Sequence, residues 1–329
     1  MSKSPQIWFS RSQVVSPLAV AVQTGKLQEA FSGLGIELQS TTDNADPDIR
    51  RSYFDHSIPW SFRQGGSLPA LWARSNGAAS RLIGLSWNNE FQAIITLQST
   101  GIKSAKDLDG RRFAIPHFSP LGVDLSAPFA LKGLLSARAT EGLDTSGIEL
   151  VDVAAAGREG TSPLGGFALG PLQPLPAEAI ALLRNEVDAI YVKGVEGVRV
   201  ANAIRASIVT EFSAHPDPWI RLGAGNPRPL TIGSLFAEER PDLVTLLLTT
   251  LGQIAPWAAQ NPEAAVGALA EIHQSSKQAV RAALGPDIGK HLTVTLKDEE
   301  LLLLERYKRQ LLDWNILTND FSISDWVAS

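Results

Sequence analysis

The chain has 329 residues, of which 44% are hydrophobic and 19% charged, and its net charge is −5. This composition excludes a disordered chain and is typical of a globular protein with about two domains and a sizeable core. There is no cysteine, and the five histidines lack metal-ligand spacing, so we expect no disulfide, no metal and no cofactor. Without a basic run or repeat, the chain is not expected to bind nucleic acid.

The N-terminal part predicts a β–α–β unit. A strand at Ile7–Phe9 leads into a loop that contains Ser12, and Ser16 and Pro17 then begin a helix. The next strand is expected at Ile36–Leu38. Ligands of such units bind at the carboxyl ends of the strands, so the loop with Ser12 is predicted to form one wall of a site.

A short stretch from residue 53 to residue 71 concentrates aromatic, basic and glycine residues. Gly65-Gly66 is expected to form a tight turn before a helix that Ser67 caps and that has a proline in its first turn. Such a helix start offers N–H groups and partial positive charge to an anion. Arg63 adds a fork of donors that matches a sulfonate, sulfinate, carboxylate or phosphate. We predict an anion site here, although a simple turn beside a surface arginine stays open.

The rest of the chain alternates between predicted strands and helices, and residues 40–51 are expected to form a polar surface loop. Strands are predicted at residues 81–87, 91–97, 112–116, 147–153, 187–192, 207–211 and 230–236, and helices at residues 120–139, 177–185, 241–259, 262–273 and 298–314. Ser119 is predicted to cap the first of these helices and to offer a second helix start to an anion. Lys193 and Gly194 directly follow a strand, where a cleft residue would lie. The Gly- and Pro-rich residues 157–176 predict a long loop, either a lid or a tolerated insertion.

This order of elements predicts an α/β protein with mostly parallel strands and two lobes. Residues 1–90 plus 231–329 are expected to form a discontinuous lobe I, and residues 91–230 an inserted lobe II, with the ligand in the cleft between them. We expect a monomer without a membrane segment, because the apolar runs are too short to span a bilayer. No signal-peptide core is visible, so the chain is expected to be cytoplasmic as it stands, or periplasmic if a signal was removed.

Several motifs resemble one family of proteins. Arg63–Leu71 reads R-x-G-G-x-x-P-x-L, Ile102–Arg112 resembles the segment that enters the second lobe, and Val187–Tyr191 matches a D-A-[IVL]-[YWF] strand. These are features of the nitrate/sulfonate/taurine solute-binding proteins of ABC transporters, which have the two-lobed type II periplasmic-binding-protein fold with a helical C-terminus. The ending, Asp298–Trp326, is similar to that of hydroxybiphenyl sulfinate desulfinase, an enzyme on the same fold.

The resemblance implies that the chain binds a small organic anion, most simply a sulfonate or sulfinate, in a hinged cleft. An ABC permease is a further implied partner if the chain is exported. The residues expected to bind the ligand are Ser12, Tyr53, His56, Trp60, Arg63, Gly65, Gly66, Ser67, Trp87, Ser119, Lys193 and Gly194.

The resemblance also leaves two alternatives open. The similar desulfinase breaks a carbon–sulfur bond with a Cys, a His and the Arg of the R-x-G-G run. Here Arg63 matches, Ser12 falls on the Cys position, Tyr53 falls on the His position, and His56 lies three residues away. A serine hydroxyl is a weak nucleophile without an adjacent base, so binding is favoured over catalysis. An enzyme that uses Ser12, His56 and Arg63 is the first alternative, and a ligand sensor on the same fold is the second.

Overall fold

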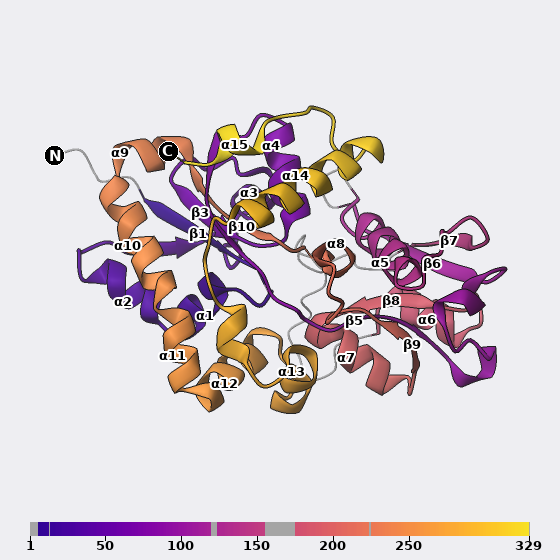
Figure 1. The fold of residues 1–329 in the computed structure, drawn as a ribbon. Helices are drawn as coiled ribbons and strands as arrows, with labels where there is room; N and C mark the ends of the chain where they lie inside the picture. The colour runs from indigo at the N-terminus through magenta and orange to yellow at the C-terminus, as the bar shows by residue number, and fades with distance from the viewer. Residues whose placement is uncertain (1–5, 13, 120–123, 155–174, 224, 329) are drawn as a thin grey trace. The chain divides into compact units, whose positions relative to one another are not determined.

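The computed structural model describes residues 6–12, 14–119, 124–154, 175–223 and 225–328. The chain divides into two compact units (Figure 1). Unit 1 consists of Met1–Asn88, Gly225–Ile272 and Asp287–Ser329, and unit 2 of Asn89–Ala224 and His273–Pro286. The segment His273–Pro286, which the sequence analysis grouped with lobe I, packs with unit 2. Both units combine strands with helices, which confirms the predicted α/β class.

Unit 1 is built on a five-stranded sheet with the order β2–β1–β3–β10–β4. Its strands are β1 (Ile7–Arg11), β2 (Leu38–Ser40), β3 (Ser61–Gln64), β4 (Ser80–Ser86) and β10 (Arg228–Gly233). β1 pairs in parallel with β2 and β3, whereas β10 runs antiparallel to both β3 and β4. The carboxyl ends of β1, β3 and β4 therefore lie at the same edge of a mixed sheet, not a mostly parallel one.

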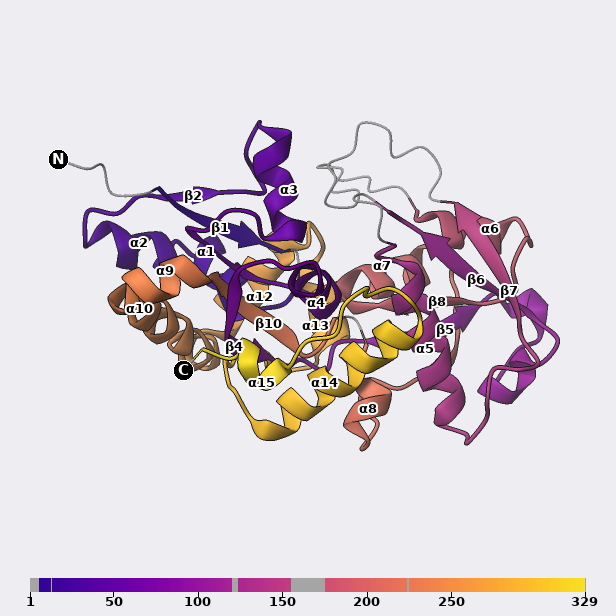
Figure 2. The ribbon, with the colours of Figure 1, turned by 90° about the horizontal axis from the view of Figure 1, so that it is seen from above.

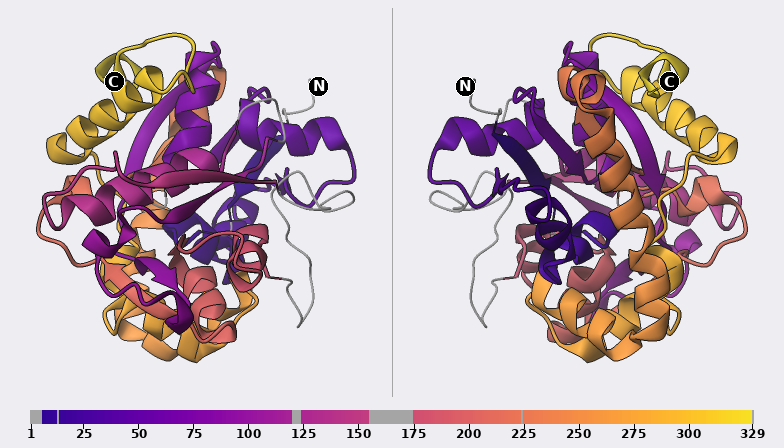
Figure 3. Two further views of the ribbon diagram at one scale, coloured as in Figure 1. Left: turned by 90° about the vertical axis from the view of Figure 1, so that its right-hand side faces the viewer. Right: turned by 90° about the vertical axis from the view of Figure 1, so that its left-hand side faces the viewer.

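Helices cover both faces of this sheet. They are α1 (Pro17–Gln23), α2 (Lys26–Ser32), α3 (Pro47–Asp55), α4 (Ser67–Ser75), α9 (Ser234–Glu239), α10 (Pro241–Gly252), α11 (Ile254–Gln260), α12 (Pro262–Ile272), α14 (Asp298–Asp313) and α15 (Ile323–Trp326), with a 3-10 turn η3 (Ile288–His291). α1 and α2 pack with α10 to α12, as the orange and indigo ribbons of Figure 3 show. α1 begins as predicted, because Ser16 Oγ accepts the Ala19 N–H at 3.2 Å and Pro17 follows the cap.

The helix α3 corrects the prediction of a surface loop over residues 40–51. Its start signal was present in the sequence: Asp46 Oδ1 accepts the Asp48 N–H at 2.9 Å, and Pro47 takes the first helical position. The helix brings Tyr53 and Phe54 into the interior, where the two rings meet edge to face with centroids 4.8 Å apart. This element supplies part of the candidate site.

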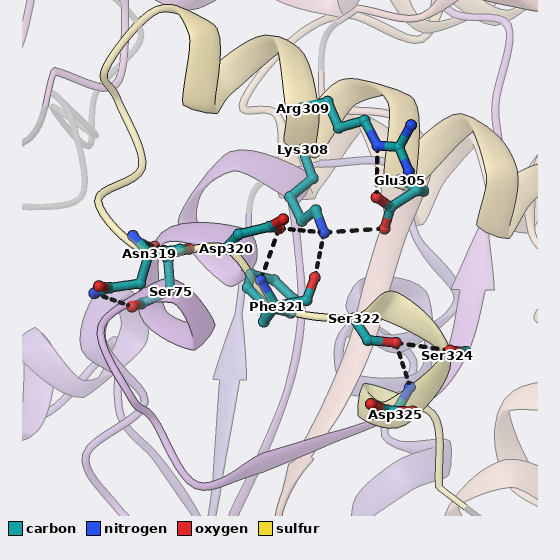
Figure 4. A network of polar contacts seen from close by, with 10 residues as sticks. All are labelled: Ser75, Glu305, Lys308, Arg309, Asn319, Asp320, Phe321, Ser322, Ser324 and Asp325. Carbon is teal, nitrogen blue, oxygen red and sulfur yellow. Dashed lines mark hydrogen bonds and ion pairs between the residues drawn. The ribbon is translucent and has the colours of Figure 1, made fainter.

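Polar contacts fasten the C-terminal segment of unit 1 (Figure 4). Lys308 of α14 is almost fully buried, and its Nζ lies 2.6 Å from Asp320 Oδ1 and donates to the backbone carbonyl of Phe321. Asn319 Nδ2 donates to the Ser75 carbonyl at the end of α4, at 2.9 Å. Figure 2 shows α14 and α15 beside α4 and β4. The C-terminal segment therefore packs against the elements that flank the start of β4.

Unit 2 has two small sheets around its own core. Its strands are β5 (Gln92–Thr96), β6 (Arg112–His117), β7 (Glu149–Ala154), β8 (Ile190–Lys193) and β9 (Ser207–Glu211), and its helices are α5 (Ala127–Ala139), α6 (Ala177–Leu183), α7 (Gly194–Ala203), α8 (Pro218–Arg221) and α13 (Lys277–Leu284), with 3-10 turns η1 (Gln98–Thr100) and η2 (Ala105–Leu108). β5 is the central strand of an antiparallel sheet with the order β8–β5–β9, while β6 and β7 pair in parallel. α5 contributes Leu134 to a core that also contains Phe113 and Tyr191.

The start of α5 corrects a second prediction. The described helix begins at Ala127, and Ser119 is an exposed residue outside it. Asp124 Oδ1 accepts the N–H groups of Ser126 and Ala127 at 2.8 and 3.0 Å, so this carboxylate supplies the acceptor expected from Ser119. Most of the predicted loop at residues 157–176 lies outside the described residues. Within the part of the chain that is described, no helix is both long and apolar enough to cross a membrane.

Candidate functional site

The candidate site lies at the carboxyl ends of β1 and β3 in unit 1. Ser12 follows β1, Arg63 belongs to β3, and Tyr53 reaches them from α3. Successive side chains of a strand point to opposite faces, so Arg63 lies on the α3 face while Phe62 stacks on a ring of α2 on the other face. Sheet pairing and α3 thus bring together three of the predicted residues that are far apart in the sequence.

Arg63 is a buried cation. Its side chain is 3% exposed, and none of its three guanidinium nitrogens has a hydrogen-bond partner among the described residues. The guanidinium carbon lies 4.6 Å from the centroid of the Tyr53 ring, within cation–π range. Burial lowers the pKa of Arg63, and the Tyr53 phenol partly opposes this effect, but an arginine stays charged at neutral pH. A buried charge without a partner of opposite sign is costly, so this position favours an anion.

Gly65 makes the position of the guanidinium possible. A Cβ on Gly65 would lie 2.7 Å from Arg63 Nη2 and 3.3 Å from Ser12 Cβ, and the first distance is shorter than carbon atoms tolerate. The backbone of Gly65 is not in the left-handed region, so the glycine is required for close approach and not for its dihedral angles. The first glycine of the Gly-Gly pair therefore shapes the candidate site directly.

Ser12 and Tyr53 form a buried pair. Tyr53 Oη donates a hydrogen bond to Ser12 Oγ at 2.8 Å, and both residues are buried. This bond fixes the serine oxygen and leaves the serine proton to be donated to another acceptor. No base among the described residues accepts that proton, so nothing in the described part of the chain activates Ser12 as a nucleophile.

His56 ends α3 close to Arg63. Its backbone takes the left-handed conformation, with φ 53° and ψ 34°, and its N–H donates to the Ser52 carbonyl at 3.0 Å. The residue is half-buried, but Nε2 is buried without a hydrogen-bond partner among the described residues. Burial, and then the charge of Arg63, lowers the pKa of His56 well below its usual value. The imidazole is therefore neutral at neutral pH.

A small cavity of about 10 Å³ is lined by both His56 and Arg63. Its polar lining consists mainly of hydroxyl groups, from Ser10, Ser52, Ser61, Ser80 and Thr231. Ser10 and Thr231 are the two neighbours of Arg63 across the sheet, on β1 and β10. Sequence reasoning missed these hydroxyls except that of Ser10, which begins the loop with Ser12 that was predicted to form one wall of the site.

The start of α4 differs from the prediction. Gly66 takes the N-cap position and Ser67 is the first helical residue, so Ser67 is not the cap. Its Oγ is buried without a partner among the described residues. The Ser67 N–H donates to the Gly225 carbonyl at 3.0 Å, and the Gly65 N–H to the Pro229 carbonyl at 3.4 Å. Carbonyl groups of the same protein therefore accept the Gly65 and Ser67 N–H groups that we predicted for the anion.

The two tryptophans have different surroundings. The Trp60 ring packs on Phe236 with centroids 5.2 Å apart, which is a core contact of unit 1 and not a contact with Arg63. Trp87 follows β4 and is half-buried. A hydrogen bond of 3.1 Å from Gln64 Nε2 to Ser86 Oγ joins the ends of β3 and β4, so Trp87 lies at the edge of the sheet that carries the candidate site.

The remaining predicted residues belong to unit 2. Lys193 ends β8, and its Nζ lies 3.8 Å from the centroid of the phenylalanine ring of α5. Gly194 begins α7 with φ 59°, and a Cβ there would lie 2.9 Å from Glu90 Oε2. Ser119 is exposed. A cleft that these residues share with Arg63 remains a prediction.

Comparison with known proteins identifies the fold. No family model matches the chain, and no curated protein matches its sequence. A Cys-to-Ser variant of the desulfurization enzyme DszB, in complex with biphenyl-2-sulfinic acid, superposes with a TM-score of 0.79 at 23% identity and covers 98% of this chain and 96% of that one. The chain has the type II periplasmic-binding-protein fold. The predicted resemblance is confirmed at this level.

Sulfonate-binding proteins share the same fold. The periplasmic aliphatic sulphonate binding protein SsuA from Escherichia coli superposes with a TM-score of 0.68 at 14% identity, with 98% of each chain covered. The alkanesulfonate-binding protein SsuA from Xanthomonas axonopodis pv. citri, bound to MOPS, gives 0.67 at 16% identity, with 100% of this chain and 99% of that chain covered. The superpositions establish a shared fold. At identities this low they do not establish a shared function, which has to be argued from the site.

Proposed function

We propose that this protein binds a small organic anion, a sulfonate or a sulfinate, through the guanidinium of Arg63. The observation that carries the proposal is the burial of Arg63 without a hydrogen-bond partner among the described residues. Two oxygens of a sulfonate or sulfinate match the planar fork of an arginine. Ser12, whose oxygen accepts from Tyr53, can donate its own proton to the same anion.

The proteins that share the fold support this class of ligand. The DszB variant holds biphenyl-2-sulfinic acid with a serine in place of a cysteine, and the Xanthomonas protein holds MOPS, which carries a sulfonate. These ligands belong to those proteins. The reason to extend their class to this chain is the buried guanidinium beside Ser12.

We also propose that the ligand is held between the two units, with Lys193 and Gly194 on the second wall. Both residues follow the carboxyl end of β8, and ligands of α/β sheets bind at such ends. These residues would shape that wall and not donate to the ligand, because the Lys193 Nζ lies 3.8 Å from the centroid of the Phe129 ring and the Gly194 N–H donates to the Phe91 carbonyl at 2.7 Å.

We propose binding and not carbon–sulfur bond cleavage. A serine nucleophile needs a base that takes its proton, and Ser12 instead accepts a hydrogen bond from Tyr53 among the described residues. His56, the candidate base, lines a small cavity together with Arg63 and several hydroxyl groups, and Ser12 is not among the residues that line it. The described arrangement therefore suits an anion-binding hydroxyl better than a nucleophile.

The test is to remove Arg63 and measure affinity by calorimetry against a panel of sulfonates, sulfinates and carboxylates. Loss of one partner of a buried charge-assisted contact costs about 2–5 kcal/mol, which is roughly thirty- to several-thousand-fold in affinity. Arg63→Ala should show this loss for the best ligand. Arg63→Lys should restore binding only in part, because it keeps the charge and loses the planar fork.

A matched control is available on the neighbouring helix. Arg51 of α3 is exposed and pairs with Asp55 at 3.3 Å, so Arg51→Ala removes the same charge without touching the buried group. It should bind like the parent protein. Arg63→Met keeps much of the buried volume and removes an unpaired charge, so it should raise the melting temperature of the ligand-free protein. Parent-like binding by Arg63→Ala would refute the proposal, and sulfite released from an aryl sulfinate would show turnover.

A further inference from the structure

The surroundings of Arg63 contain one charge and one group that can gain a charge. Of the ten described residues that line the small cavity, only Arg63 and His56 are ionisable. The elements β1, β4, β10 and α3 contribute hydroxyl or apolar groups to the lining, apart from His56 itself. The carboxylate nearest in sequence, Asp55, is paired with Arg51, and the Tyr53 phenol donates to Ser12. At neutral pH the described cluster therefore has a single positive charge.

The position of His56 is not what helix capping alone requires. A C-cap in the left-handed conformation favours glycine or asparagine, and a histidine there is strained. This conformation nevertheless places Nε2 inside the protein without a hydrogen-bond partner among the described residues. Four other non-glycine residues of the described chain take the same conformation, so the backbone alone does not mark a site. The unpaired Nε2 and the place of His56 in the cavity lining beside Arg63 indicate that the ring has a role there.

We propose that His56 sets the charge of the anion that the Arg63 cluster accepts. This inference rests on the proposed function. While the imidazole is neutral, Arg63 balances a ligand with one negative charge. A second negative charge would be buried without compensation, unless His56 takes up a proton from solvent together with the ligand. A ligand with two negative charges is therefore bound only with a proton.

The direction of the pH effect follows from this arrangement. In the ligand-free protein, burial and Arg63 hold the pKa of His56 low. A bound dianion would raise this pKa, because it cancels the repulsion from Arg63 and attracts the proton. Affinity for a dianion should consequently increase as the pH falls through the raised, ligand-bound pKa, and should level off below the ligand-free pKa. Affinity for a monoanion should change little over the same range.

Methanesulfonate and sulfate provide the test. Both are tetrahedral and similar in size, they differ by one negative charge, and neither titrates near neutral pH. Calorimetry across a pH series, in buffers of different ionisation enthalpy, measures both affinity and proton uptake. At about pH 8 we expect sulfate to bind roughly a hundredfold or more weakly than methanesulfonate, because it leaves a buried charge unbalanced. On acidification sulfate should gain up to about tenfold per pH unit, with about one proton taken up per ligand.

Two variants complete the experiment. His56→Asn keeps a residue that tolerates the left-handed backbone and removes the titrating ring, so the ratio of sulfate to methanesulfonate affinity should no longer depend on pH. His215→Asn removes a histidine of unit 2 whose Nδ1 accepts the Asp217 N–H, and it should retain the pH dependence of the parent protein.

The outcomes separate this inference from the proposed function. Sulfate that binds the parent protein as tightly as methanesulfonate at pH 8, or that gains nothing on acidification, overturns the role of His56. A pH dependence that persists in His56→Asn has the same consequence. If methanesulfonate and the other sulfonates fail to bind the parent protein, the proposed function itself is wrong, and this inference falls with it.

Discussion

At the scale of single residues, the position of Arg63 depends on a neighbour that has no side chain. A Cβ on Gly65 would lie only 2.7 Å from Arg63 Nη2. The protein interior is closely packed and has no room for both the guanidinium and a methyl group on residue 65. A methyl group there would therefore force the guanidinium to move. Gly65 therefore controls the geometry of Arg63 at the candidate site.

Gly65→Ala should consequently weaken anion binding while the protein still folds. The added methyl group would push the guanidinium away from Ser12, and loss of one charge-assisted hydrogen bond corresponds to about ten- to a hundredfold in affinity. Calorimetry with the best sulfonate measures the effect, and a thermal melt checks the fold. Gly252→Ala is the matched control, because a Cβ at this helical glycine meets no atom within 4 Å. Parent-like affinity of Gly65→Ala would show that Arg63 reaches the ligand from another position.

At the scale of elements, a histidine joins three segments of unit 2. His117 ends β6, and its Nδ1 lies 2.5 Å from Asp124 Oδ2, before α5, while its Nε2 lies 2.8 Å from Asp152 Oδ1 on β7. The hydrogen bond to Asp152 raises the pKa of His117 most. The hydrogen bond to Asp124 and the negative charge of Asp124 raise it further. The charged imidazole thus holds the end of β6 to its neighbours.

The stability of the protein should therefore decrease as the pH rises through the raised pKa of His117. A group whose pKa is higher in the folded protein stabilises it below the unfolded value, about 6.5, and this contribution disappears on deprotonation. Because His117 is 42% exposed, solvent screens the pairs and the effect should stay below about 1 kcal/mol. Thermal melts between about pH 6 and pH 9 should show a smaller pH dependence for His117→Gln than for the parent protein.

His215→Asn serves as the control for this measurement, since Asn can still accept the Asp217 N–H. Its melting temperature should follow the parent protein across the pH range. If His117→Gln follows the parent protein as well, the contacts with Asp124 and Asp152 do not contribute to stability, and the charge of the imidazole is irrelevant to unit 2.

At the scale of the whole molecule, the chain passes between two compact units four times, at the boundaries near residues 88, 224, 272 and 286. Unit 1 has one five-stranded sheet, and unit 2 has two smaller sheets with a hydrophobic core of its own. Units of this kind commonly move relative to each other when a ligand binds between them. The proposed function therefore includes closure of the two units on the anion.

We expect a saturating sulfonate to decrease the radius of gyration of the parent protein in small-angle X-ray scattering. Arg63→Ala at the same ligand concentration should keep the larger radius, because it lacks the contact that holds the ligand. A ligand that binds tightly in calorimetry and leaves the radius unchanged would argue against a hinged cleft. It would leave the anion site in unit 1 intact.

The sequence by itself determined the features that depend on a few neighbouring residues. Ser16 and Pro17 predicted the start of α1, because a cap and a first-turn proline act within one turn. The R-x-G-G run predicted a turn at Gly65-Gly66 that opens a helix, and α4 begins directly after it at Ser67. The same local signal at Asp46 and Pro47 was present but was hidden in a polar run, so α3 was missed.

Only the tertiary structure decided that Arg63 is buried and what surrounds it. Ser12 and Arg63 become neighbours because β1 pairs with β3, and Tyr53 joins them from a helix 41 residues beyond Ser12. Strand β10, from the C-terminal half of the chain, inserts between β3 and β4 and brings Thr231 beside Arg63. The burial, the partners and the pKa of a group depend on residues that are distant in the sequence, and pairing over such distances leaves no periodic signal in the sequence around the group itself.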